Sequence, residues 1–215
     1  MSAATAIAPA RTERTSALEV YRDDGPLARA LGAALGVSLP LPALALIAAG
    51  LVPLLLAIAV GGDDVPRGVA AAVVGWIVLT AGASSGRPHR DRLRWLVPSA
   101  LRLGEYAGLL WLGALDSSVG VPSAFALIAV LAFRHYDLVY RLRQRGDTPP
   151  RWLNDASGGW DGRLLLAWVL LAAGALPAAF YVLAAMLGVL FVAESAASWA
   201  HAAPAFLEDE EDEGQ

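Results

Sequence analysis

Several residue types are missing or scarce in this chain of 215 residues. It has no cysteine, which excludes disulfide bonds, thiolate nucleophiles and zinc sites built from thiolates. Lysine is also absent, so all 16 permanently cationic residues are arginine, which indicates a bacterial coding sequence of high GC content. Charged residues make up 17% of the chain, against about a quarter in a soluble domain. The sequence lacks a glycine-rich phosphate-binding loop, a serine nucleophile elbow and a nucleic-acid-binding module, so no nucleic-acid partner is expected.

Apolar residues, in contrast, are abundant and form long blocks. They account for 57% of the chain and give a mean hydropathy of +0.53. Blocks of about 20 apolar residues are typical of helices that cross a bilayer. The sequence therefore predicts an all-α, polytopic membrane protein, a bundle of about six transmembrane helices plus a juxtamembrane helix. The predicted spans are 41–60, 67–84, 95–115, 121–140, 161–175 and 177–201, with a turn near 174–177 dividing the last apolar block.

One membrane domain, residues 21–203, occupies most of the chain. We expect a disordered tail at 1–20, which has no apolar core of a signal peptide, and an acidic disordered tail at 204–215. Between the first tail and the first span, leucine recurs every four residues at Leu27, Leu31 and Leu35, after a proline suited to a first helical position. This pattern predicts either a helix lying in the membrane interface or the leading turn of the first span.

Arginine is concentrated in alternate connections between the predicted spans. The N-terminal segment and the connections 85–94 and 141–160 are rich in arginine, whereas the other three connections hold only Arg67. Because positively charged loops remain in the cytoplasm, this distribution predicts a multi-pass protein of the inner (plasma) membrane with both termini in the cytoplasm.

Ionisable residues inside the predicted spans gather in the cytoplasmic halves of those spans. Such residues are costly in a bilayer and usually face the bundle interior or a water-filled cavity. The functional interpretation is a polar cavity that is open to the cytoplasm. Its candidate lining residues are Arg102, Glu105, Arg134, His135, Asp137, Arg141, Asp161, Arg163, Glu194 and His201.

Three arginines and three acids of this set could share one ligand. Guanidinium groups match the oxygens of a phosphate or pyrophosphate, and the acids could bind a divalent cation or act as a base. Mg²⁺ or Mn²⁺ would be a cofactor only if the acids form a metal site; otherwise the cofactor is unknown. The arginines are Arg102, Arg134 and Arg141, and the acids are Glu105, Asp137 and Glu194.

The alternative interpretation is an internal network of salt bridges that neutralises these buried charges. Arg102 would pair with Glu105, Arg134 with Asp137, and Glu194 with a neighbouring arginine.

Histidine and tryptophan near the span ends have simpler interpretations. His89 and His135 are too isolated for a metal-ligand motif, so each is predicted to have a structural role. The tryptophans at the span ends, which include Trp95, Trp152 and Trp160, are predicted to be interfacial anchors.

Three stretches of the sequence resemble the CDP-alcohol phosphatidyltransferases. They are 24–29 (DGPLAR), 135–143 (HYDLVYRLR) and 162–166 (GRLLL). More closely, over about residues 24–201, the chain resembles a bacterial membrane domain of unknown function that is found with, or fused behind, those enzymes. The resemblance implies a phosphatidyltransferase-like helical bundle and a role in phospholipid metabolism.

The catalytic aspartates of those enzymes have no counterpart in this chain. The enzymes carry D-x-x-D-G-x-x-A-R followed by G-x-x-x-D-x-x-x-D, whose aspartates hold metal ions and supply the base. Here the stretch 80–102, at the end of the second span and the start of the third, has Asp91 as its single acidic residue. Residues 24–29 match part of the motif by letters, but Tyr21 stands in place of the first aspartate and the second half does not follow.

The leading hypothesis is therefore a catalytically degenerate relative of these enzymes. It would act as a membrane partner or substrate-handling subunit in phospholipid or lipid-linked headgroup synthesis. Its expected partners are the lipid bilayer, a CDP-alcohol phosphatidyltransferase and a second copy of itself. Two alternatives stay open, a membrane enzyme that uses the polar cluster of the spans and a small-molecule transporter, so the sequence does not decide whether the protein is an enzyme.

Overall fold

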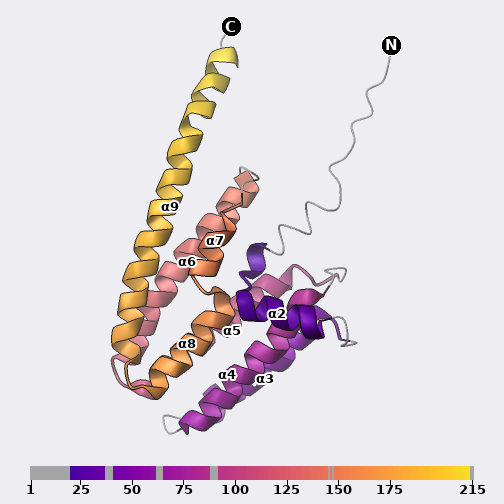
Figure 1. The fold of residues 1–215 in the computed structure, drawn as a ribbon, viewed down its shortest axis with the longest axis vertical. Coiled ribbons are helices and arrows are strands. Elements are labelled where there is room, and N and C mark those ends of the chain that lie inside the picture. The colour runs from indigo at the N-terminus through magenta and orange to yellow at the C-terminus, as the bar shows by residue number, and fades with distance from the viewer. Residues whose placement is uncertain are drawn as a thin grey trace.

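The protein is seen in a computed structural model, which is all-helical in the part of the chain it describes and contains no strand there (Figure 1). Its helices occupy every one of the predicted spans. The described residues are 20–36, 41–61, 65–87, 92–144, 146 and 148–213, the last thirteen by their backbone alone. The labelled helices are α2 (Pro26–Leu35), α3 (Ala43–Val60), α4 (Arg67–Ala83), η1 (Ser84–Gly86), α5 (Leu96–Asp116), α6 (Gly120–Gln144), α7 (Arg151–Ala156), α8 (Gly159–Ala172) and α9 (Leu176–Glu213).

Four of the helices are long and apolar enough to cross a membrane, by length and composition. α5 and α8 do not meet that standard, for two different reasons. α5 has 21 residues, but Arg102 and Glu105 lower its hydropathy. α8 has 14 residues, which span about 21 Å, while the hydrocarbon core of a bilayer is about 30 Å thick. The four helices are Ala43–Val60, Arg67–Gly86, Gly120–Gln144 and Leu176–Ala200.

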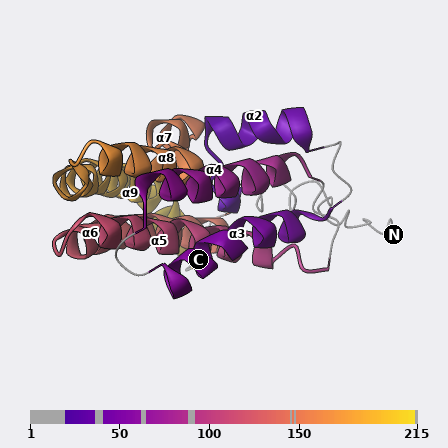
Figure 2. The same cartoon turned by 90° about the horizontal axis from the view of Figure 1, so that it is seen from below.

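The helices form two layers. Figure 2 shows α4 and α8 on one side and α3, α5 and α6 on the other, with α2 lying outside α4. α5 contacts α3, α6 and α8, and so occupies the middle of the bundle. α9 packs mainly along α6.

Close backbone contact and leucine packing hold α5 against α6. A Cβ atom added at Gly120 would lie 2.0 Å from the carbonyl oxygen of Gly113, so only glycine allows the two helices to approach this closely. Leu112 of α5 and Leu131 of α6 are fully buried in the hydrophobic core. Lipid is as apolar as leucine, so such tight packing, made possible by small residues, is what stabilises helix contacts in a membrane.

α2 is a separate short helix and not the leading turn of the first span. It begins at Pro26, ends before Gly36 and packs across the end of α4 against η1, as Figure 1 shows. Gly32 allows the close approach, because a Cβ atom there would lie 2.5 Å from the backbone nitrogen of Gly86. Leu27 stays 40% exposed on the outer side. An amphipathic helix at the end of the bundle fits the predicted interfacial position.

The last apolar block folds back on itself where the sequence predicts a turn. α8 ends at Ala172 and α9 begins at Leu176, with Gly174 at φ +68° between them. Glycine adopts this left-handed conformation without steric cost. The backbone of α9 is helical as far as Glu213 and so extends into the stretch 204–215. Alanine, leucine and glutamate in this stretch have high helix propensity, which favours continuation of the helix. The expected tail at 1–20 falls almost entirely outside the described residues.

Candidate functional site

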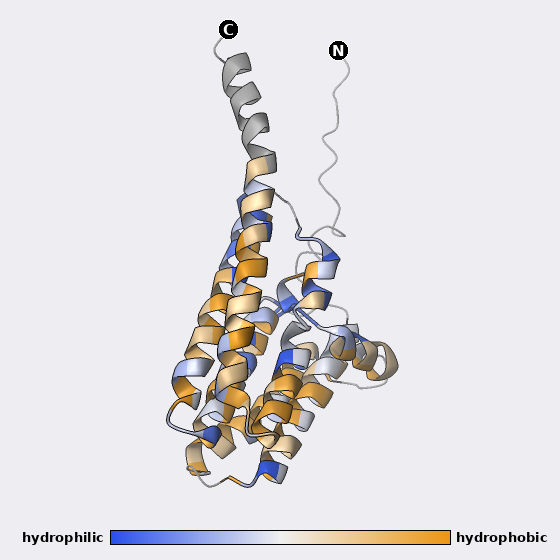
Figure 3. Ribbon diagram, turned by 60° about the vertical axis from the view of Figure 1, so that its left-hand side comes forward, coloured by the Kyte–Doolittle hydropathy of each residue, from blue (hydrophilic) through white to orange (hydrophobic). Residues whose placement is uncertain are grey.

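Polar side chains gather at one end of the helical bundle. Figure 3 shows this polar region where the segment before α2, α7 and the last turns of α6 meet, above an apolar body. Buried charges at this end form three groups of contacts.

The first group, the Asp23 cluster, consists of Asp23, Arg102, Glu105, His135 and Arg163. Arg163 is its centre, because Nη2 lies 2.6 Å from Asp23 Oδ2 and Nε lies 2.6 Å from Glu105 Oε1. Arg102 Nη1 lies 3.6 Å from the same oxygen of Asp23 and 3.4 Å from Glu105 Oε2. The predicted pairing of Arg102 with Glu105 is confirmed. The two arginines balance the two acids, so the cluster ties the N-terminal segment to α5 and α8 without a net charge.

His135 completes this cluster with both of its ring nitrogens. Nδ1 lies 2.6 Å from the Tyr106 hydroxyl, and Nε2 lies 3.4 Å from Asp23 Oδ2. A neutral imidazole with its proton on Nε2 satisfies both contacts. The histidine therefore has the structural role that the sequence predicts. The other histidine assessed, His89, lies outside the described residues.

The charge state of Asp23 follows from its surroundings. Burial raises the pKa of this carboxyl, but the guanidinium of Arg163, the hydrogen bond with His135 and the charge of Arg102 together hold the pKa well below its usual range. Asp23 is therefore a permanent carboxylate at neutral pH, fully engaged as a counter-charge.

The second group, the Arg141 cluster, joins α6 to α9. Arg141 donates to both oxygens of Glu194 at 2.9 and 2.7 Å, and its Nη2 lies 2.9 Å from Asp137 Oδ2. Ser195 Oγ donates to Asp137 Oδ1 at 2.9 Å. The predicted pairing of Glu194 with an arginine is confirmed. The predicted pair of Arg134 with Asp137 is wrong, because Arg141 takes that carboxylate from the next turn of the same helix.

The third group fixes the segment that leads into α2. Asp161 of α8 accepts hydrogen bonds from the backbone N–H of Gly25 at 2.6 Å and of Ala28 at 3.0 Å. The carboxylate thus takes two amides that a helix start leaves without partners. Asp24 is held by Arg22 at 2.6 Å and by Trp160 Nε1 at 2.8 Å.

Trp160 is not the interfacial anchor that its position near a span end predicts. It is 1% exposed, and its indole nitrogen is satisfied by a carboxylate inside the protein. Its backbone N–H also donates to the carbonyl of Asp23 at 3.2 Å. Trp95 and Trp152, in contrast, are exposed, as an anchor requires.

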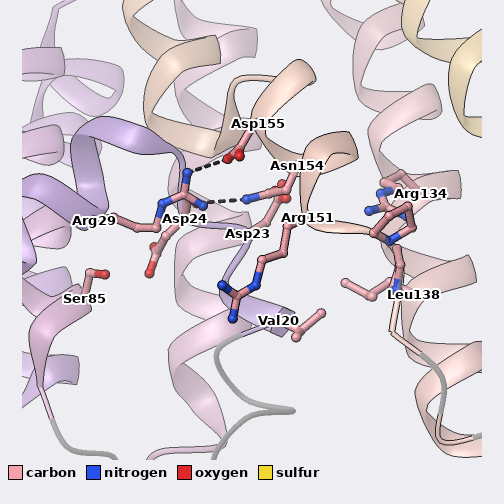
Figure 4. A pocket seen from close by; sticks show the side chains of 12 residues that line it. Val20, Asp23, Asp24, Arg29, Ser85, Arg134, Leu138, Arg151, Asn154 and Asp155 are labelled. Atoms are coloured by element: carbon pink, nitrogen blue, oxygen red, sulfur yellow. Dashed lines mark hydrogen bonds and ion pairs between the residues drawn. The ribbon is translucent and has the colours of Figure 1, made fainter.

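A cavity of about 450 Å³ opens beside these groups, between α2, α6 and α7 (Figure 4). Three arginines and three aspartates are among its lining residues. The complete lining is Val20, Asp23, Asp24, Arg29, Ser85, Arg134, Leu138, Pro149, Pro150, Arg151, Asn154 and Asp155.

Only Arg134, of the ten residues predicted to line a cavity, lies on this wall. Its guanidinium lies over the Phe191 ring, 5.4 Å from the ring centroid, and its Nη1 atom is buried with no hydrogen-bond partner among the described residues. Eight others belong to the Asp23 cluster, to the Arg141 cluster or, for Asp161, to the start of α2. The side chain of His201 lies outside the described part of the chain.

Sequence reasoning missed most of the cavity wall. Asp23, Asp24 and Arg29 lie before the first span, and Arg151 and Asn154 lie in a long connection. One signal was available in each segment. Two adjacent acids precede a helix start, and a tryptophan–leucine–asparagine–aspartate run follows a pair of prolines.

The acids proposed as metal ligands are engaged with arginine. Glu105 contacts Arg163, while Asp137 and Glu194 both contact Arg141. Within the described residues, no group of three or more histidine, aspartate and glutamate side chains is placed to hold a metal ion. The arrangement offers guanidinium N–H donors, and not free carboxylates, to a ligand.

The fold and the cavity define a class, an all-helical protein with four helices able to cross a membrane and a polar, arginine-lined cavity at one end. The chain belongs to the family of unknown function DUF5941, which matches residues 12–215. No curated protein and no solved structure matches the chain.

Proposed function

We propose that the protein is a membrane-embedded subunit that holds a phosphate-bearing headgroup for phospholipid or lipid-linked headgroup synthesis, without catalysing transfer itself. The observation that carries this proposal is the cavity at the polar end of an apolar bundle, with Arg134 and Arg151 on its wall. Phosphate groups of lipids lie at this level, where a membrane helix passes into the polar region. A pocket of this size also suits a headgroup-sized ligand.

In this proposal the chain crosses the inner membrane six times, with both termini in the cytoplasm. α5 would be one crossing although it is charged, because Glu105 is 1% exposed and Arg102 contacts Asp23 and Glu105 within the protein. Ionisable residues that face the bundle interior in this way are tolerated in a membrane. α8 would be a short crossing that packs against α4 and α5. The described parts of the arginine-rich connections lie at the cavity end, which would face the cytoplasm.

The proposal also retains the resemblance to the CDP-alcohol phosphatidyltransferases as a shared layout. The absence of their paired aspartates from 80–102 argues for a degenerate relative that works beside an intact enzyme. The engaged acids support the same view, because Asp137 and Glu194 are counter-charges of one arginine and are not free to act as a base.

The test uses the full chain, purified and placed in nanodiscs. A CDP-linked alcohol and its lipid acceptor are supplied with Mg²⁺ or Mn²⁺, first to the protein alone and then with an intact CDP-alcohol phosphatidyltransferase from the same genome. We expect no transfer by the protein alone, co-elution of the two proteins, and a lower KM of the enzyme in the complex. Metal-dependent transfer by the protein alone would overturn the proposal.

A further inference from the structure

We infer that the cavity is a metal-independent binding site for a phosphate group, held by the guanidinium groups of Arg134 and Arg151. This inference names the ligand chemistry of the site used in the proposed function, and it rests on that function for the biological source of the ligand.

Arg134 is the first reason for the assignment. Its side chain projects from α6 into the cavity and is only 7% exposed, yet Nη1 has no hydrogen-bond partner in the described part of the chain. A buried guanidinium N–H without a partner is unfavourable, since it has lost its hydrogen bond to water and has formed no hydrogen bond within the protein. Phe191 covers one face of the guanidinium and leaves its in-plane N–H groups directed elsewhere. Nη1 itself is sealed from the cavity, but Nε and Nη2 are not, and they form no hydrogen bond within the described residues, so an anion in the cavity would bind at these two atoms.

The balance of charge on the cavity wall is the second reason. Each lining carboxylate already has a cation of its own, because Asp23 is bound by Arg163, Asp24 by Arg22, and Asp155 by Arg29. Arg29 is consumed in that pairing, whereas Arg134 and Arg151 form no ion pair within the described residues. Arg134 and Arg151 therefore remain on the wall as cations that no carboxylate of the described residues contacts directly. A guanidinium group can bind two phosphate oxygens at once, so each of these arginines offers the donors that a phosphate group needs.

Neither the backbone amides at a helix start nor a carboxylate-bound metal ion would hold the phosphate at this site. The free amides at the start of α2 do not serve a ligand, because the Asp161 carboxylate already accepts from Gly25 and Ala28. The lining aspartates are counter-charges of arginine, so the positive charge that a phosphate needs comes from the protein. Binding should therefore not require Mg²⁺. The volume of about 450 Å³ exceeds that of a phosphate group, which leaves space for the alcohol to which it is attached.

The experiment measures phosphate binding to the detergent-purified full chain by titration calorimetry. Inorganic phosphate is titrated in the presence of EDTA and again with Mg²⁺, and we expect the same affinity in both. Arg134→Gln should weaken binding at least about tenfold, because one charge-assisted contact is lost. Arg134→Lys keeps the positive charge but loses the two parallel N–H donors of the guanidinium group. Its affinity for phosphate should lie between those of the wild type and Arg134→Gln. Arg67→Gln is the matched control, since Arg67 lies at the opposite end of α4 and contacts Ala172, and its affinity should equal the wild-type value.

A second variant protects the test against a folding defect. Arg151 is exposed, so Arg151→Gln should keep the wild-type melting temperature and still weaken phosphate binding at least about tenfold. Two further ligands identify the source. Tighter binding of dihexanoyl phosphatidic acid than of glycerol 3-phosphate would assign the site to a lipid headgroup, and equal binding would assign it to a free phosphate monoester.

Three results would overturn the inference: no saturable binding of any of these ligands, loss of binding in EDTA, or wild-type affinity in both Arg134→Gln and Arg151→Gln. None of these results depends on the transfer assay. Transfer by the protein alone would reject the proposed function and leave the phosphate site intact.

Discussion

Arg141 of α6 holds both carboxylate oxygens of Glu194 in α9, at 2.9 and 2.7 Å, and binds Asp137 of its own helix as well. Arg141 is 1% exposed, so three charges share a nearly water-free contact between the two helices. One cation facing two anions leaves this cluster with a net negative charge, and Arg134 lies one to two turns away on the same helix. The contact therefore fixes α9 against the helix that carries the proposed phosphate ligand.

Removal of the shared cation should destabilise the protein strongly. Arg141→Ala leaves the buried Asp137 and the partly buried Glu194 without their shared cation, which should cost about 3–5 kcal/mol. The change is measured as a fall in melting temperature in detergent. Arg143→Ala removes an exposed arginine from the same helix and should cost less than about 0.5 kcal/mol. Equal effects of the two substitutions would show that the Arg141 cluster contributes no special stability.

Gly159 should not tolerate alanine. Its φ is +63°, and a Cβ atom there would lie 2.2 Å from the backbone nitrogen of Gly25. Gly159→Ala should therefore displace the segment before α2 and cost more than about 2 kcal/mol. Gly75→Ala is the matched control, because a Cβ atom at Gly75 meets nothing within 4 Å. In that helical position alanine should be neutral or stabilise by up to about 1 kcal/mol, and a similar loss in both variants would contradict the steric explanation.

Asp23 should make stability depend on pH in the acid range. Its pKa is lower in the folded than in the unfolded protein, because Arg163, His135 and Arg102 outweigh the effect of burial. The stabilisation from this carboxylate is therefore complete above the unfolded pKa of about 4 and is lost as the pH falls below it. Melting temperatures should fall more steeply below pH 4 in the wild type than in Asp23→Asn.

The control for this measurement is Asp116→Asn, which removes one carboxylate at the far end of α5. That variant should retain the wild-type pH profile. A profile of Asp23→Asn that coincides with the wild type would show that the acid sensitivity arises elsewhere.

The cysteine-free sequence allows a direct test of the proposed topology. Ser117→Cys and Ala173→Cys place a thiol after α5 and after α8, and Arg143→Cys places one near the end of α6. In intact cells an impermeant thiol reagent should label the first two and should reach Arg143→Cys only after permeabilisation. Labelling of Ser117→Cys without Ala173→Cys would mean that α8 does not cross the membrane.

The positions of the helices were largely predictable because they depend on local sequence. Long apolar blocks, the glycine near 174 and the proline at 26 each act through neighbouring residues, and helices occur at all six predicted spans. The gathering of charges at one end was also predictable from the depth of each residue within its span.

The partners of those charges were less predictable, because they depend on how each helix is rotated. Spacing alone allows Asp137 to pair with Arg134 at i−3 or with Arg141 at i+4, and the structure selects Arg141. The role of Asp23 could not be predicted without knowing that the segment before α2 folds against α8. Its partner there, Arg163, lies 140 residues further along the chain. The letters DGPLAR at 24–29, which match only part of an enzyme motif, form instead the start of α2 and one side of the cavity.

The hydrogen bonds that Asp161 accepts from the start of α2 also have a consequence for biogenesis. The amides of Gly25 and Ala28 are synthesised long before the carboxylate that accepts from them. During translation they can bond only to water or to lipid headgroups, so α2, which also packs against α4 and η1, gains this attachment only after α8 has left the ribosome. The cavity wall that α2 contributes is thus fixed in place late, although all the described residues that line the cavity precede Asp161 in the chain.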